Sequence, residues 1–374
     1  MISGMMPSGM TPLTYLILGQ GLLQLAVCGL LAWRIFRDRR LPPPKRPPKV
    51  SVVVPCKGNI DTRNISRMLQ QDYKGAVEFL FVSPSEQDPA FRSIRAFLAE
   101  GEETRARMLS SGAVPKRCGE AMLNCIHGAE NASQDSEVLV YTDADLRVPP
   151  DWVSRLIQAL EEPGVGVASA FMTNTPEPGS PWSYFRTLWC GLMSPLFNLR
   201  PGVYGHSYAI RRADFQAWDI AGLWSRVITT DAPMTPVVKA HGKTIRYAPL
   251  AAPAHAGPCD AESFFRVFGK WAFYVKLYAW PDWLVSLAAV SGKLALYVLA
   301  AFSQHPALNL GALCLGDMFY GLCCLRGISC ALLTPLLWPL YLTSLLSAVG
   351  RKDILWGGYA YRIRGPFDIE VLRT

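Results

Sequence analysis

Residues 137–145 read Glu-Val-Leu-Val-Tyr-Thr-Asp-Ala-Asp, an apolar run that ends directly in two acids. Such a run is typical of a buried strand in a parallel sheet. Two similar runs lie upstream, at residues 49–55 and 77–83. Stretches with apolar residues at helical spacing separate these runs, at residues 60–71, 90–100 and 120–132. The alternation predicts an α/β fold, with helices on both faces of a parallel sheet and ligands bound beyond the carboxyl ends of its strands.

The two acids, Asp143 and Asp145, follow one of these strand ends. Carboxylates two residues apart can share a hard divalent cation, Mg²⁺ or Mn²⁺, which binds a diphosphate and neutralises it as a leaving group. The alternative interpretation is an Asx turn whose acids are solvated. Zinc is not expected, because the sequence contains no C-x-x-C pair. The pair therefore predicts either a metal site or a polar turn.

The composition indicates a membrane protein. Of the 374 residues, 50% are hydrophobic and 18% are charged, which is too apolar for a chain that is soluble throughout. Residues 11–33 carry no charge and are long enough to cross ~30 Å of hydrocarbon. A cleaved signal peptide is the alternative, but it needs a basic start and residues 1–10 carry no charged side chain. We therefore expect an N-terminal transmembrane anchor.

Seven basic residues crowd positions 34–49, with only Asp38 opposing them. The net charge of +8 is thus a cluster beside an apolar segment, which argues for a membrane flank and against nucleic acid. The positive-inside rule then predicts that the chain after Arg34 is cytosolic. Residues 1–48 form an anchor and a basic, Pro-rich linker in this interpretation.

Three further apolar stretches lie at residues 283–303, 307–325 and 328–349. Their flanks disagree, because Arg326 and the basic residues after 350 both favour the cytosol. We therefore expect an even number of crossings here, with one stretch interfacial or re-entrant, in a multi-pass protein with a cytosolic catalytic domain. The predicted units are a catalytic domain over 49–278, C-terminal transmembrane helices over 279–350 and a basic cytosolic tail over 351–374.

Several motifs occur together in the order that one family has. They lie at residues 50–58, 71–73, 87–90, 140–145, 205–212, 228–234 and 270–271. This set resembles the membrane-bound GT-A glycosyltransferases of family 2, and within them the ceramide glucosyltransferase-like branch. The resemblance implies a GT-A domain that moves a sugar, with inversion and with a metal ion, from a UDP-sugar to a membrane lipid. The acceptor would be ceramide-like or another lipid alcohol.

The resemblance also implies roles for single residues. Asp231 would be the catalytic base, and its alternative role is the N-cap of a helix over 232–240. Asp143 and Asp145 would hold the metal ion. The donor would be bound by Pro55, Lys57, Asp143, Lys270 and Trp271. His206 and His255 are weaker candidates, because a histidine in a loop is usually just exposed.

The loop after residues 77–83 departs from the family pattern. Pro84 and Ser85 stand where the family has an acid that holds the nucleoside. Unpaired nucleoside donors would cost ~1–3 kcal/mol each, so we expect Glu86 or Asp88 to turn inward and bind the donor.

Further departures are Ala121 in place of a lysine, Val267 in place of a glutamine and Lys270 in place of an arginine. A lysine keeps the charge but loses the planar fork that suits phosphate. These changes suggest an altered donor or a degenerate enzyme. A processive β-glycan synthase and a non-catalytic membrane protein that keeps the GT-A fold stay open as alternatives. Two aromatic stretches, at residues 182–199 and 264–278, are candidates for membrane-lying helices, with core packing as the other explanation.

Overall fold

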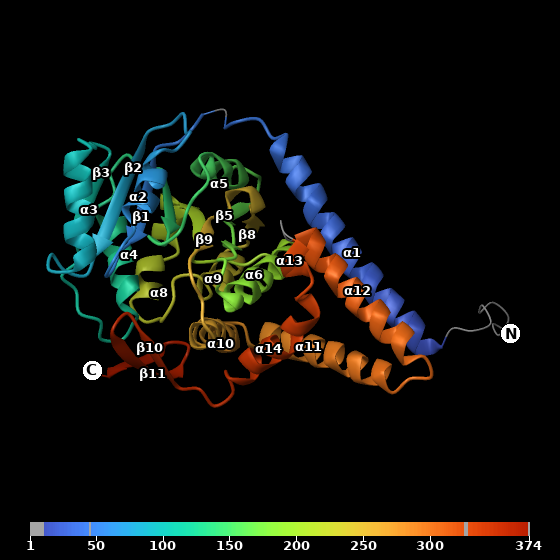
Figure 1. Cartoon of the computed structure of the whole chain (residues 1–374). Coiled ribbons are helices and arrows are strands. Elements are labelled where there is room, and N and C mark those ends of the chain that lie inside the picture. The colour runs from blue at the N-terminus through green and yellow to red at the C-terminus, as the bar shows by residue number, and fades with distance from the viewer. Residues whose placement is uncertain (1–10, 45, 325–327, 373–374) are drawn as a thin grey trace.

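Figure 1 shows a layered α/β domain beside a bundle of long apolar helices. The structure is a computed structural model that describes residues 11–44, 46–324 and 328–372. Arg326, which bears on the topology expected above, lies outside the described residues.

The α/β domain is built on a sheet that has seven strands within the described residues, in the order β3-β2-β1-β4-β7-β5-β8. The strands are β1 (Val50–Pro55), β2 (Val77–Ser83), β3 (Ala106–Ser110), β4 (Val138–Thr142), β5 (Val165–Ser169), β7 (Ser207–Arg211) and β8 (Thr244–Tyr247). Neighbouring strands are parallel except at β7, which is antiparallel to both β4 and β5. The predicted parallel sheet is confirmed, and the reversed β7 is an addition to it.

Side chains alternate across the sheet and pack two separate cores. Val52 and Val54 of β1 point to one face and Val53 to the other. The first face is covered by α2 (Thr62–Leu69), α3 (Pro89–Glu100) and α5 (Trp152–Leu160). The second is covered by α4 (Glu120–Glu130), α7 (Arg212–Ala217), α8 (Ile220–Trp224) and α9 (Met234–Ala240). Helices on both faces are what the sequence pattern predicted.

Smaller elements complete the domain. β6 (Thr173–Thr175) pairs with β9 (Ala254–Ala256), and a short 3-10 helix, η1 (Pro249–Ala251), precedes β9. The last described residues form a separate antiparallel sheet of β10 (Asp353–Trp356), β11 (Tyr359–Gly365) and β12 (Asp368–Leu372). The region that the sequence indicated only as a basic tail is therefore folded, and it packs against the α/β domain.

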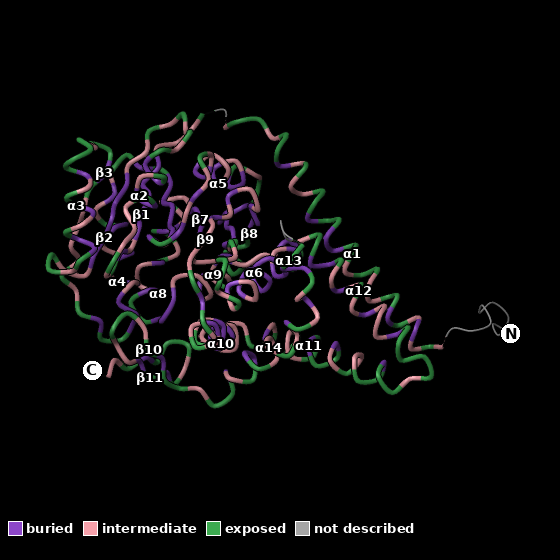
Figure 2. The backbone as a smooth tube through the Cα atoms, in the orientation of Figure 1, coloured by how far each residue is buried: buried purple, intermediate pink, exposed green. Residues whose placement is uncertain are grey.

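Three of the described helices are long and apolar enough to cross a membrane, which is compatible with a membrane protein. They are α1 (Pro12–Arg39), α11 (Trp280–Ala301) and α12 (Pro306–Cys324). No more than 28% of the most apolar window of each is buried within the protein, and Figure 2 shows many exposed residues along them. Their outer faces thus carry apolar side chains that water would not favour.

The third C-terminal apolar stretch is broken into α13 (Ile328–Ala331) and α14 (Thr334–Leu346). At 1.5 Å per residue, the 13 residues of α14 reach only ~20 Å, short of the ~30 Å of a bilayer core. A length of ~20 Å suits the interfacial or re-entrant stretch that the sequence predicted among the C-terminal apolar segments.

The apolar helices are held together by buried polar side chains. Asp317 of α12 accepts hydrogen bonds from Gln24, Tyr297 and Trp338 and pairs with Lys293 of α11 at 2.7 Å. Because Gln24 belongs to α1 and Trp338 to α14, this one carboxylate links four helices. Polar groups that are paired in this way fix which helix faces meet.

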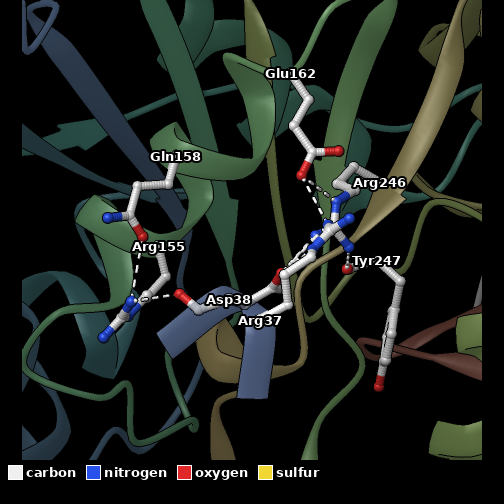
Figure 3. A network of polar contacts seen from close by, with 7 residues as sticks. All are labelled: Arg37, Asp38, Arg155, Gln158, Glu162, Arg246 and Tyr247. Carbon is white, nitrogen blue, oxygen red and sulfur yellow. Dashed lines mark hydrogen bonds and ion pairs between the residues drawn. The ribbon is translucent and has the colours of Figure 1, made fainter. Parts of the chain in front are cut away.

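A second polar network joins the end of α1 to the sheet domain (Figure 3). The buried guanidinium of Arg246, in β8, lies 2.7 Å from Asp38 of α1 and 2.8 Å from Glu162. Arg37 of α1 reaches the same Glu162 carboxylate at 3.1 Å, and Arg155 of α5 donates to the carbonyl oxygen of Asp38. The anchor helix is therefore fixed to the domain rather than tethered by the linker alone.

Two aromatic helices lie between the sheet and the bundle: α6 (Pro181–Leu199) and α10 (Ala261–Tyr278). Most of α6 is buried, and it packs against α1, α10, α12, α13 and α14. Trp189 of α6 stacks on Phe268 of α10 at a centroid distance of 4.3 Å and also contacts Tyr341 of α14. Core packing thus accounts for the aromatic residues of α6.

Candidate active site

A cavity of about 560 Å³ opens at the carboxyl ends of β1 and β4. Such a volume is typical of a small-molecule site. Because β7 runs in reverse, its first residues also lie at this edge, beside the end of β4. The cavity brings together seven of the residues predicted from the sequence: Pro55, Lys57, Asp143, Asp145, Asp231, Lys270 and Trp271.

Asp143 and Asp145 lie side by side in this cavity, but in different surroundings. Burial, with Asp145 and Asp231 nearby, raises the pKa of Asp143 to about 8. The Asp145 side chain is 65% exposed, and its Oδ2 lies 3.8 Å from Nε2 of His255 on β9. The described residues hold no group of three or more His, Cys, Asp or Glu side chains placed to bind an ion. A cation here would therefore take its remaining ligands from substrate phosphate and water, as Mg²⁺ commonly does.

Asp231 lies at the cavity wall, in the loop before α9. Its Oδ2 accepts a hydrogen bond from the backbone N–H of Gly205 at 2.9 Å. Its Oδ1 accepts from the Thr229 hydroxyl at 2.5 Å and from the Ala232 N–H at 2.7 Å. The helix begins only at Met234, with Pro233 as its N-cap, so the alternative role of Asp231 as a helix cap is wrong.

Lys270 and Trp271 reach the cavity from α10. Burial lowers the pKa of Lys270, although Asp143 and Asp231 oppose this shift. The ammonium lies 5.1 Å from the ring centroid of Trp356 in β10. The Trp271 ring meets the His206 ring edge to face at 5.2 Å. Lys270 and Trp271 thus share the cavity with the two carboxylates of the D-x-D pair.

The model of glycosyl transferase family 21 matches residues 13–365, which is nearly the whole chain. The protein belongs to glycosyl transferase family 21. It is therefore a glycosyltransferase, and a nucleotide sugar is supported as its donor. The family differs in number from the family 2 expected above, and the ceramide branch of that expectation is not shown by the match.

Two solved structures are similar to this chain. A mannosyltransferase from Pyrobaculum calidifontis in complex with GDP-Man and Mn²⁺ has 15% identity and a TM-score of 0.49, covering 90% of this chain and 97% of that one. GalNAc-T7 with UDP, GalNAc and Mn²⁺ has 14% identity and a TM-score of 0.45, covering 66% of this chain and 52% of that one. No curated protein sequence matches the chain.

Lys57 of the glycosyltransferase is already engaged at the cavity rim. Its ammonium forms an ion pair with Glu120 at the start of α4 and donates to the carbonyl oxygen of Gly357 at 2.5 Å. The Tyr359 ring centroid is 5.1 Å away. The charge of Lys57 is therefore largely compensated by Glu120, whose side chain is only 7% exposed.

Glu86 and Asp88 are not brought to the cavity. Asp88 accepts from the N–H of Gly58 at 2.8 Å and of Ala90 at 2.9 Å, so its carboxylate caps α3 and ties it to the turn after β1. Glu86 is exposed and lies in a shallow hollow beside Phe91 and Arg92 of α3. The inward turn expected for one of these acids is not what the structure has.

Three further residues line the cavity: Tyr141 and Tyr208, which the sequence did not single out, and His206, which it offered as a weaker candidate. The Tyr141 hydroxyl and Nδ1 of His206 are buried without a hydrogen-bond partner among the described residues. Burial lowers the pKa of His206 to about 4, which keeps its ring neutral. A tyrosine within an apolar strand is read as core from sequence, so only the cavity distinguishes Tyr141 and Tyr208.

Proposed function

We propose that this glycosyltransferase moves a sugar with inversion from a UDP-sugar to the hydroxyl of a membrane lipid. The observation that carries the proposal is the arrangement of one cavity. It brings the D-x-D pair and Lys270 together with the oriented carboxylate of Asp231. Its wall includes α10, which leads into the apolar helix α11. The proposal places the catalytic domain on the cytosolic side of a multi-pass protein.

Asp143 and Asp145 are proposed as the metal ligands, with Mg²⁺ or Mn²⁺ as the ion. The residues fit such an ion, because no described group hydrogen-bonds the Asp143 carboxylate and burial disfavours its charge. When bound, the cation neutralises the diphosphate as it leaves. Lys270, whose ammonium is held in the same cavity, adds a positive charge for the diphosphate oxygens.

Asp231 is proposed as the general base. As the acceptor oxygen forms its bond to the sugar, the bond from the sugar to the diphosphate breaks, and the acceptor proton passes to Asp231. The three hydrogen bonds to Asp231 leave the carboxylate little freedom to rotate. The neutral His206 lies nearby with a free Nδ1 and offers a hydrogen bond to a hydroxyl group.

A lipid acceptor is supported by an exposed apolar surface where α6 and α11 meet. Arg200 at the end of α6 pairs with Asp282 near the start of α11 at 2.6 Å, so the two helices meet. Exposed apolar side chains gather around this junction: Leu196, Leu199, Trp280, Leu284 and Val285. Such a surface next to candidate membrane helices suits a headgroup region, from which a lipid hydroxyl would reach the site.

The proposal is tested by incubating the purified protein in lipid vesicles with a panel of UDP-sugars and GDP-sugars and with Mn²⁺. A lipid product heavier by one sugar, formed from a UDP-sugar, is expected in the mass spectrum. A water-soluble polymer would favour a processive synthase instead. Transfer from GDP-sugars alone would contradict the choice of UDP.

A further inference from the structure

The turn between β10 and β11 lies at the rim of the cavity. Gly357 and Gly358 both have positive φ, at 60° and 82°, between the paired residues Trp356 and Tyr359. This geometry is that of a tight two-residue hairpin, for which glycine is favoured at both positions. Trp356, Gly357 and Tyr361 line the cavity. The C-terminal sheet therefore contributes a wall to a site that is otherwise built from the α/β domain, α6 and α10.

The hairpin is packed tightly in this place. A Cβ added at Gly119, the N-cap of α4, would lie 2.9 Å from the Trp356 ring. The Tyr361 hydroxyl accepts a hydrogen bond from the N–H of Glu120 at 3.2 Å. Behind the hairpin, Ile354 and Tyr361 are buried in a cluster with Phe273 of α10. The position of the Trp356 ring is thus determined by contacts on several sides.

The two lysines of the cavity are held differently by this hairpin. Lys57 is neutralised by Glu120, so its charge is not free for a ligand. Lys270 has no ion pair or hydrogen bond within the described residues, and its ammonium lies over the Trp356 ring, 5.1 Å from the ring centroid. An ammonium at this distance from an indole face is attracted by the ring and keeps its donors available.

We infer that Trp356 is a positioning residue of the donor site. Its ring holds the Lys270 ammonium toward the cavity, where it binds the diphosphate of the nucleotide sugar. By this inference the C-terminal hairpin takes part in donor recognition. This inference rests on the proposed function, because it takes the ligand of Lys270 to be the donor diphosphate.

The test compares Trp356→Phe with Trp356→Leu in the full-length protein, with the UDP-sugar that the wild type uses. Phenylalanine keeps an aromatic face, whereas leucine keeps only apolar bulk. Trp356→Leu is expected to raise the donor KM by about three- to tenfold with little change in kcat, and Trp356→Phe by less than about twofold. Leu355→Ala is the matched control, since that neighbouring side chain is 75% exposed. Its donor KM is expected to equal that of the wild type.

A double-mutant cycle separates positioning from packing. In a Lys270→Met background, Trp356→Leu is expected to add no further increase in donor KM. An equal effect of the leucine variant with and without Lys270, or equal effects of leucine and phenylalanine, would overturn the inference. If Trp356→Leu does not fold, Trp356→Met takes its place in the same cycle. A wild-type protein that neither transfers sugar nor binds UDP contradicts the proposed function instead, so the two failures are distinguishable.

Discussion

The helix bundle and the cavity both hold ionisable side chains, but in the cavity some of these side chains have no partner among the described residues. Asp317 accepts hydrogen bonds at both carboxylate oxygens, and Lys293 reaches both Asp317 and Gln20. In the cavity, no described group hydrogen-bonds the Asp143 carboxylate, and Nδ1 of His206 is buried without a partner among the described residues. A buried group left unpaired costs ~1–3 kcal/mol, so such groups persist where a ligand completes them.

The contrast separates structure from chemistry in this chain. Charges in the bundle specify how the helices meet, and their loss should change stability. Ionisable groups in the cavity are placed to contact the donor and the acceptor, and their loss should change turnover. Each of the following substitutions tests whether a residue acts mainly in stability or in turnover.

The largest effect is expected for Asp145→Ala, which should abolish transfer. The variant should bind UDP more weakly in the presence of Mn²⁺ and as well as the wild type in EDTA, because the carboxylate acts through the cation. Calorimetry in the two conditions measures this. Equal weakening in both would mean that Asp145 maintains the loop and binds no metal.

Asp231→Asn keeps the size of the side chain and an oxygen that can accept from Gly205. It removes the base, so kcat should fall by about a hundredfold or more while donor affinity and thermal stability are retained. Steady-state kinetics and melting in detergent test both statements. A fall of less than about threefold would place the base elsewhere.

Asp317→Leu should have the opposite profile. Breaking a buried pair costs about 3–5 kcal/mol, because the charge of Lys293 is left uncompensated, so the melting temperature should drop. The kcat of the folded fraction should be unchanged. The double variant Asp317→Leu with Lys293→Leu is the control and should regain much of the lost stability. A stable Asp317→Leu variant with a lower kcat would mean that Asp317 acts in the reaction and not in stability.

The smallest effect is expected for Glu86→Ala, since Glu86 is exposed and does not line the cavity. Its donor KM should stay within about twofold of the wild type. An increase of about tenfold would mean that the loop turns inward on donor binding, as the sequence had suggested.

Much of the α/β domain could be predicted from local pattern. The apolar runs and their spacing indicate the parallel strands, and parallel strands place Pro55 and Asp143 at one edge. The reversed β7 could not be predicted this way, because its direction depends on which neighbours it pairs with. Without that reversal, His206 and Tyr208 would not be expected beside the D-x-D pair.

The C-terminal hairpin was missed although its signal is local. Gly357-Gly358 between Trp356 and Tyr359 is a two-glycine turn between β-favouring residues, which indicates a hairpin. The basic side chains around it favoured a tail instead. The expectation that Glu86 or Asp88 turns inward differs from the structure for another reason, since Asp88 caps α3 and so determines the path of that loop.

The most direct test of the proposed reaction is the anomeric configuration of the product. Transfer from an α-linked UDP-sugar with Asp231 as base predicts a β-linked glycolipid, read from the anomeric proton in the NMR spectrum of the extracted lipid, and its absence with Asp231→Asn. An α-linked product, or the same β-linked product at undiminished rate from Asp231→Asn, would contradict inverting transfer at this cavity.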